Sequence, residues 1–235
     1  MKLRQIITLT TLFLLPLGVW AGIELTATYT NQKGEEMTRK ENFTEEAPLH
    51  VLFRSNATNL EAGSTIEWHF KHEGANGGSN ITRYEEDTEF DFTESGITVV
   101  ALYVRQGDDI VLSDSINVTI SESHLEMPNA FSPNDDGTND RYGAKGVNNE
   151  DADGHWKSIV EFHAYIFNRW GQKLYEWHDV AGYWDGTYNG HPVKDGVYYV
   201  YVNARGADGR EYKIRRDVNL IRNFNEIESS STGTP

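Results

Sequence analysis

The sequence predicts an all-β protein made of two consecutive antiparallel β-sandwiches of the immunoglobulin-like type. Apolar and polar residues alternate in many short runs, which is the period-two pattern of strands with one buried face. Gly, Asn and Asp clusters separate these runs about every 8 to 12 residues, as turns do in sandwiches. No segment of helical length shows a 3.6-residue period.

Nine segments show the strand pattern. They are residues 23–30, 48–55, 65–72, 96–106, 114–121, 159–169, 172–179, 196–206 and 211–222. In the last of these, alternation separates an apolar face from a partly basic one. The apolar face holds Tyr212, Ile214, Val218 and Leu220, and the other holds Lys213, Arg215, Asp217 and Asn219. The basic face is interpreted either as a solvated strand face that discourages aggregation or as a docking surface.

The chain begins with the features of a secretory signal peptide. Lys2 and Arg4 precede an apolar run from residue 6 to residue 19, and compact residues come before Gly22. The run is shorter than the roughly 20 residues that a membrane-spanning helix needs. We therefore expect residues 1–21 to be removed on export.

Composition narrows the class of protein. The formal net charge is -15, and residues 22–124 contain 19 acidic residues against 7 Lys and Arg. This excess argues against nucleic acid as a partner and favours cations or basic surfaces. The chain has no cysteine, so a disulfide framework is excluded.

The first sandwich is expected at residues 22–122. The stretches "STIEWHFKHEG" and "FTESGITVVALYVRQG" resemble the Trp-containing strand and the following Gly-strand segment of PKD modules. Trp68 is expected in the core, because large aromatic side chains dominate the cores of sandwiches. A break is expected near residues 121–128, where a Pro precedes a new pattern.

The second sandwich is expected at residues 125–222, with a disordered tail at residues 223–235 that is rich in Ser, Thr and Gly. The stretches "MPNAFSPNDDGTNDRY", "IFNRWGQKLYEW", "WDGTYNG", "VKDGVYYVYV" and "VNLIR" follow one another in this region. In this order they resemble the gliding-motility-associated C-terminal domain of Bacteroidetes, the type B sorting domain of the type IX secretion system.

The resemblance implies export to the cell surface or outer membrane, with retention there or release. It implies as partners the translocon, associated outer-membrane proteins and a surface or periplasmic signalling partner. Residues of these motifs would then be read by the secretion machinery. They are Asn134, Asp136, Gly137, Asn139, Asp140, Asn168, Arg169, Trp170, Gly171, Trp184, Asp185, Gly186, Gly196, Arg215, Arg216 and Arg222.

The same motifs predict local turns. Asn168 and Gly171 are expected to adopt positive φ in a hairpin turn that Trp170 covers. The Asp-Gly pairs at residues 185–186, 195–196 and 208–209 each indicate a tight turn.

Two acid-rich loops fit part of a calcium loop, in which oxygen ligands alternate before a Gly. The first set of ligands would be Asn134, Asp136 and Asp140, and the second Asn149, Asp151 and Asp153. Both loops lack the acidic residue at the twelfth position that closes such a site. Turns held by Asn and Asp side chains explain the same residues, so calcium stays an alternative.

Three functions are compatible with the sequence. The first is a non-enzymatic component or signalling partner of the type IX system, similar to its small PorA-type component. The second is cargo that acts as a small adhesin or glycan-binding module. The third is an unrecognised hydrolase, which is disfavoured because no nucleophile elbow, Walker loop or metalloprotease motif occurs. Ser115 also fits the short Asp-Ser/Thr-apolar pattern of O-glycosylation.

Overall fold

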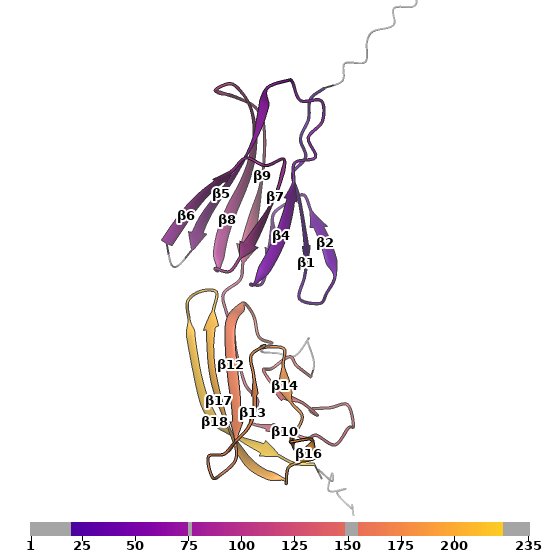
Figure 1. Cartoon of the computed structure of the whole chain (residues 1–235), viewed down its shortest axis with the longest axis vertical. Helices are drawn as coiled ribbons and strands as arrows, with labels where there is room; N and C mark the ends of the chain where they lie inside the picture. The colour runs from indigo at the N-terminus through magenta and orange to yellow at the C-terminus, as the bar shows by residue number, and fades with distance from the viewer. Residues whose placement is uncertain (1–19, 75–76, 149–154, 223–235) are drawn as a thin grey trace, which may run out of the picture.

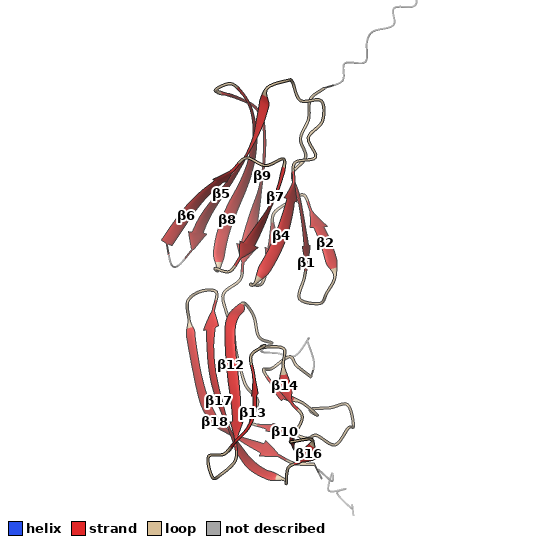
Figure 2. Ribbon diagram, in the orientation of Figure 1, coloured by secondary structure: helices blue, strands red, loops and turns tan. Residues whose placement is uncertain are grey.

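The computed structural model describes residues 20–74, 77–148 and 155–222. In this part of the chain every regular element is a strand, which confirms the all-β prediction (Figure 2). Most of the predicted signal peptide, the candidate calcium ligands Asn149, Asp151 and Asp153, and the predicted tail at residues 223–235 lie outside the described residues.

Two sheets pack face to face in the N-terminal half (Figure 1). The four-stranded sheet has the order β2-β1-β4-β7, formed by Glu36–Arg39, Thr26–Thr30, Leu49–Arg54 and Asp87–Phe92. The five-stranded sheet has the order β3-β9-β8-β5-β6, formed by Phe43–Glu45, Asp109–Ile120, Gly96–Gln106, Ser64–Gly74 and Gly77–Arg83.

A second five-stranded sheet dominates the C-terminal half. Its order is β10-β18-β17-β12-β13, formed by Ala130–Phe131, Glu211–Leu220, Gly196–Gly206, Ile159–Phe167 and Lys173–Trp177. Two short pairs lie against it (Figure 1). They are β11 (Tyr142–Gly143) with β14 (Tyr183–Trp184), and β15 (Thr187–Tyr188) with β16 (His191–Pro192).

Two of the predicted strands, 96–106 and 196–206, match β8 and β17 residue for residue. The sequence patterns missed β6, whose residues are exposed at the sheet edge and therefore show no apolar alternation. They also missed the acid-rich β7, because Asp disfavours strands in general. Pairing is antiparallel except at two sheet edges, where β3 runs parallel to β9 and β10 runs parallel to β18.

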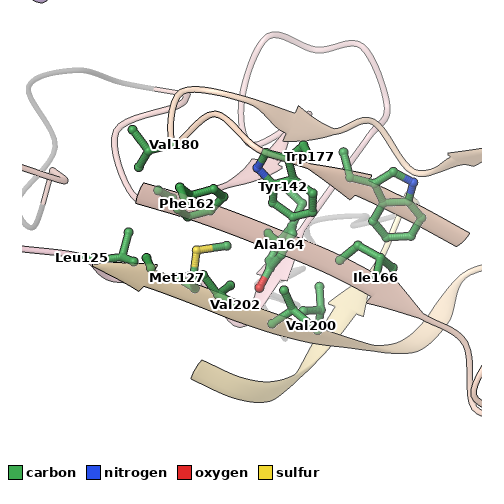
Figure 3. Close-up of a cluster of buried hydrophobic side chains, with 14 of the residues drawn as sticks. Leu125, Met127, Tyr142, Phe162, Ala164, Ile166, Trp177, Val180, Val200 and Val202 are labelled. Atoms are coloured by element: carbon green, nitrogen blue, oxygen red, sulfur yellow. The ribbon is translucent and has the colours of Figure 1, made fainter. Parts of the chain in front are cut away.

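Each half has its own apolar core. In the N-terminal half Trp68 is fully buried as predicted, next to Phe53, with ring centroids 6.1 Å apart. In the C-terminal half the inward residues of β12 and β17 meet Tyr142, Trp177 and Met127 (Figure 3). The chain passes from one core to the other between Ile120 and Leu125.

The tip of the β17–β18 hairpin lies against the base of the N-terminal sandwich (Figure 1). Ala207 is 2 % exposed and belongs to the N-terminal core, although it lies far along the chain from the rest of that core. Its carbonyl accepts a hydrogen bond from the Ser95 amide at 3.0 Å. Val160, the second residue of the neighbouring strand β12, packs against this core as well.

Ser158 connects three segments at the junction between the halves. Its hydroxyl accepts a hydrogen bond from the Ala47 amide at 3.2 Å and lies 3.1 Å from the Ser121 hydroxyl. Its carbonyl accepts a hydrogen bond from the Ala207 amide at 2.9 Å. Ser158 is fully buried with φ of 47°, a conformation that a residue other than Gly adopts only when its surroundings hold it there.

Candidate functional site

Several of the motif residues predicted from the sequence gather at the end of the C-terminal sandwich that is remote from the N-terminal half (Figure 1). Arg222 joins them. Its guanidinium donates hydrogen bonds to the carbonyls of Val193 and Gly186 and to the Asp195 carboxylate at 2.6, 3.1 and 2.8 Å. We call this the distal end, formed by residues 132–140, 168–172, 184–196 and 222.

Gly186 allows these loops to approach closely. A Cβ at this position would lie 3.0 Å from the Pro133 ring and 3.2 Å from the Arg222 guanidinium, and the residue has φ of 78°. A larger residue would therefore separate the loop at residue 133 from the final strand. The Asp-Gly turn expected at residues 185–186 is present, and the Asp185 carboxylate accepts from the Thr187 amide at 2.9 Å.

The loop at residues 132–140 is organised around Asp140. Its carboxylate accepts the backbone N–H groups of Asn134, Asp135 and Gly137 at 2.9, 2.7 and 2.8 Å. Burial opposes the charged form, but these three donors together outweigh it and lower the pKa of Asp140.

A second acid of this loop, Asp136, acts in the same way. Its carboxylate accepts the Thr138 amide and the Asn134 side-chain amide, both at 2.8 Å. Asn139 adopts φ of 54° and Gly137 φ of 86°, so both bend the chain back on itself. The carboxylates of Asp136 and Asp140 are thus occupied by the loop's own N–H groups. Among the described residues, no three or more His, Asp or Glu side chains are arranged to hold a metal ion.

Replacing Asp140 with Asn is expected to destabilise the folded protein, and most strongly above about pH 4. The folded pKa lies below the ordinary value of 3.8, so the ionised carboxylate stabilises the fold above that pH. This contribution is lost as pH falls through the folded pKa. Urea midpoints at pH 7 and pH 3 measure it, with the exposed neighbour Asp135→Asn as the control. Equal behaviour of the two variants would contradict the role given to Asp140.

The turn between β12 and β13 differs from the expected one. Gly171 has φ of 78° as predicted, but Asn168 does not have positive φ. The Asn168 side-chain oxygen instead accepts the amides of Trp170 and Gln172, both at 3.0 Å, which forms an Asx turn. Gln172 also donates to the Tyr188 hydroxyl at 3.1 Å and so attaches this turn to β15.

Trp170 does not cover the turn but projects into solvent with 81 % of its surface exposed. The Arg169 guanidinium lies 5.2 Å from its ring centroid, close enough for a cation–π contact. Trp184 has the opposite environment. It is fully buried between Phe131 and Tyr198, with ring centroids 5.4 and 5.3 Å away. It therefore cannot touch a partner in the folded domain, contrary to its place among the candidate recognition residues.

The two arginines of β18 have different roles. Arg216 donates to the Met127 carbonyl at 2.6 Å and ties the strand to the start of the C-terminal core. Arg215 lies on the outer face, as predicted, 4.8 Å from the Tyr201 ring, and it lowers the pKa of that hydroxyl. Gly196 has φ of 149° at the start of β17, and Arg222 lies beyond the end of β18 at the distal end.

Some residues of the distal end were not expected from the sequence. The Asp195 carboxylate accepts hydrogen bonds from both the amide and the guanidinium of Arg222. The sequence indicates for this residue only a place in an Asp-Gly turn. Tyr188 showed no strand pattern because β15 has two residues. Ser115, the candidate glycosylation residue, is exposed in β9 of the N-terminal half, and its modification stays a prediction.

Within residues 20–74, 77–148 and 155–222, no helix is long and apolar enough to cross a membrane. Residues 125–215 match the family model described as the CHU_C type IX secretion signal domain. No curated protein matches the chain.

A search of solved structures matches the chain to the tetra-tandem repeat in the extending region of a large adhesion protein, among others. It has 10 % identity, covers 87 % of this chain and 68 % of that chain, and has a TM-score of 0.25. Dimeric latent PorU from Porphyromonas gingivalis has 10 % identity and a TM-score of 0.24, and the match covers 86 % of this chain and 20 % of that chain. The chicken CNTN1 FN1-FN3 domains have 9 % identity and a TM-score of 0.22, and the match covers 79 % of this chain and 68 % of that chain.

Proposed function

We propose that this protein works at the cell surface as a non-enzymatic component or signalling partner of the type IX secretion system. It carries a type IX secretion signal domain at residues 125–215 and is exported across the envelope by that pathway. The signal domain associates it with the type IX machinery in general. The finer role rests on how the domain is connected to the sandwich that precedes it.

The distal end is the surface that we assign to recognition by the machinery. It lies at the opposite end of the signal domain from the N-terminal sandwich, so a partner can reach it while that sandwich is folded (Figure 1). Its loops are held in place by Asp140, Asn168 and Arg222 through hydrogen bonds to backbone groups. A loop fixed in this way loses little conformational entropy on binding, which favours affinity. The exposed pair Arg169 and Trp170 supplies the residue types that dominate binding energy at interfaces.

The observation that supports a permanent role is the junction. The Ala207 side chain completes the N-terminal core, and the Ser95 and Ala47 amides bond to residues of the signal domain. Removing the signal domain after export would expose this part of the N-terminal core and leave those two amides without their partners. Such a connection suits a protein in which the signal domain is kept as part of the working molecule.

A second candidate is cargo that acts as a small adhesin or glycan-binding module. The charge of the N-terminal half favours it, since residues 22–124 have 19 acidic residues against 7 Lys and Arg. A surface of this charge attracts basic partners and cations outside the cell.

Deleting the gene and comparing the secreted and surface proteins separates the two candidates. If the protein is a component or signalling partner, unrelated type IX cargo is expected to accumulate in the periplasm, and a plasmid copy should restore its export. Unchanged export of all other cargo would contradict the component function and favour the adhesin.

A further inference from the structure

Two histidines face each other on the outer side of the C-terminal sheet. His163 lies in β12, and His178 directly follows β13. The register pairs Ala164 with Trp177, so the next opposed pair on the two antiparallel segments is His163 with His178. Their Nδ1 atoms are 2.9 Å apart, and their ring centroids are 4.6 Å apart at an interplanar angle of 74°.

This geometry constrains the protons. Two Nδ1–H groups cannot point at each other at this distance, so at least one of the two Nδ1 atoms presents a lone pair. The Nε2 atom of His178 lies 3.6 Å from the Glu176 carboxylate, whose other oxygen bonds Lys173. A carboxylate beside Nε2 favours the tautomer with the proton on Nε2, which leaves the Nδ1 lone pair of His178 available.

We propose that His163 and His178 form a two-imidazole chelate for a divalent transition metal ion, with Cu²⁺ and Ni²⁺ bound in preference to Zn²⁺. A carboxylate that orients the far nitrogen of a ligating imidazole is the usual support of such sites, and Glu176 is placed to provide it for His178. Since both rings lie on the exposed face, water occupies the other coordination positions.

The distance between the nitrogens gives the selectivity. With metal–nitrogen bonds of about 2.0–2.1 Å, nitrogens 2.9 Å apart subtend an angle of about 90° at the metal. That is the angle between neighbouring ligands in the tetragonal sites of Cu²⁺ and Ni²⁺. A tetrahedral Zn²⁺ site would need the nitrogens about 3.3 Å apart. Cu²⁺ also forms the stronger complexes with imidazole in the Irving–Williams order.

The neighbouring charges allow a cation to approach. Glu161 and Arg205 form an ion pair on the same face, and Glu176 pairs with Lys173, so these acids and bases balance.

Calorimetric titration of CuCl₂ and NiCl₂ into the purified chain at pH 7.5 tests the proposal, with His163→Gln, His178→Gln and the double variant. We expect one Cu²⁺ ion per chain at this pair, Ni²⁺ bound about tenfold or more weakly, and Zn²⁺ more weakly still. Each single variant should weaken Cu²⁺ binding at least about tenfold, and the double variant should lack the site.

The matched control is His191→Gln, an exposed histidine in β16. It should leave the titration unchanged. In the wild type the bound Cu²⁺ should show coupling to two nitrogens in its electron paramagnetic resonance spectrum. An ion that binds only the folded chain should also raise Tm. Near-UV circular dichroism checks that the variants fold. Equal Cu²⁺ affinity in the wild type and the double variant, or no binding to the wild type, would overturn the proposal and leave the pair as a hydrogen bond only.

Discussion

Without residues 125–235, the N-terminal half is expected to stay in the periplasm. The match to a type IX secretion signal covers residues 125–215, so the truncated chain keeps the predicted signal peptide and loses the type IX signal. Surface protease accessibility and immunoblots of periplasm and medium measure the outcome. The expected result is loss of nearly all surface signal, with the protein recovered from the periplasm.

This deletion also removes Ala207 and Ser158, which contact the N-terminal sandwich. Failure to fold must therefore be separated from failure to be addressed. Fusing residues 125–222 to an unrelated periplasmic protein provides the control, because the fusion should reach the surface even if the truncated chain is degraded. Normal surface display of the truncated chain would sink the assignment of the export signal.

Replacing either of two tryptophans of the signal domain with Ala is expected to reduce export, but for different reasons. Trp184→Ala should act through loss of stability, and Trp170→Ala through loss of recognition. Trp184→Ala removes a fully buried ring between Phe131 and Tyr198 and should cost about 3–5 kcal/mol of unfolding free energy. For a domain of this size, Tm should fall by about 12 °C or more. Export should then fall because a larger fraction of the domain is unfolded.

Trp170→Ala should leave Tm within about 3 °C of the wild type, because the side chain is 81 % exposed. Within the described part of the chain, its one aromatic or cation–π contact is with Arg169. Export efficiency should nevertheless fall severalfold, since Trp170 and Arg169 are the exposed anchors of the distal end. Calorimetric scans of the purified variants, with secretion assays, give both quantities. Unchanged export of Trp170→Ala would contradict recognition at this turn.

The strands and the turns were predictable to different degrees. The strands β8 and β17 could be placed to the residue because one face of each is buried, and burial leaves an apolar alternation in the sequence. The strand β6 has no such face and left no signal. Two of the three Asp-Gly pairs predicted a reversal of the chain correctly, because Gly adopts positive φ at little cost, as at Gly186 and Gly209. At the third pair the chain only bends at Asp195, and Gly196 already begins β17.

The candidate site was less predictable because it depends on which side chains are exposed and which are buried. Trp170 and Trp184 both stand in short motifs beside a turn, and nothing in those motifs says that one is exposed and the other buried. The contacts of Arg222 with Val193 and Asp195 join segments almost 30 residues apart. The opposition of His163 and His178 depends on the strand register, which single-sequence patterns do not set.

The junction has a consequence for the time at which the protein is made. Synthesis proceeds from the N-terminus, so the residues of the first sandwich appear well before Val160 and Ala207, which complete its core. A chain that stops short of residue 207 therefore leaves the base of that sandwich uncovered, with the Ser95 amide unpaired. Both halves are closed only once the chain extends through the β17–β18 hairpin, so shorter products are expected to open locally and to be cleaved more readily by proteases.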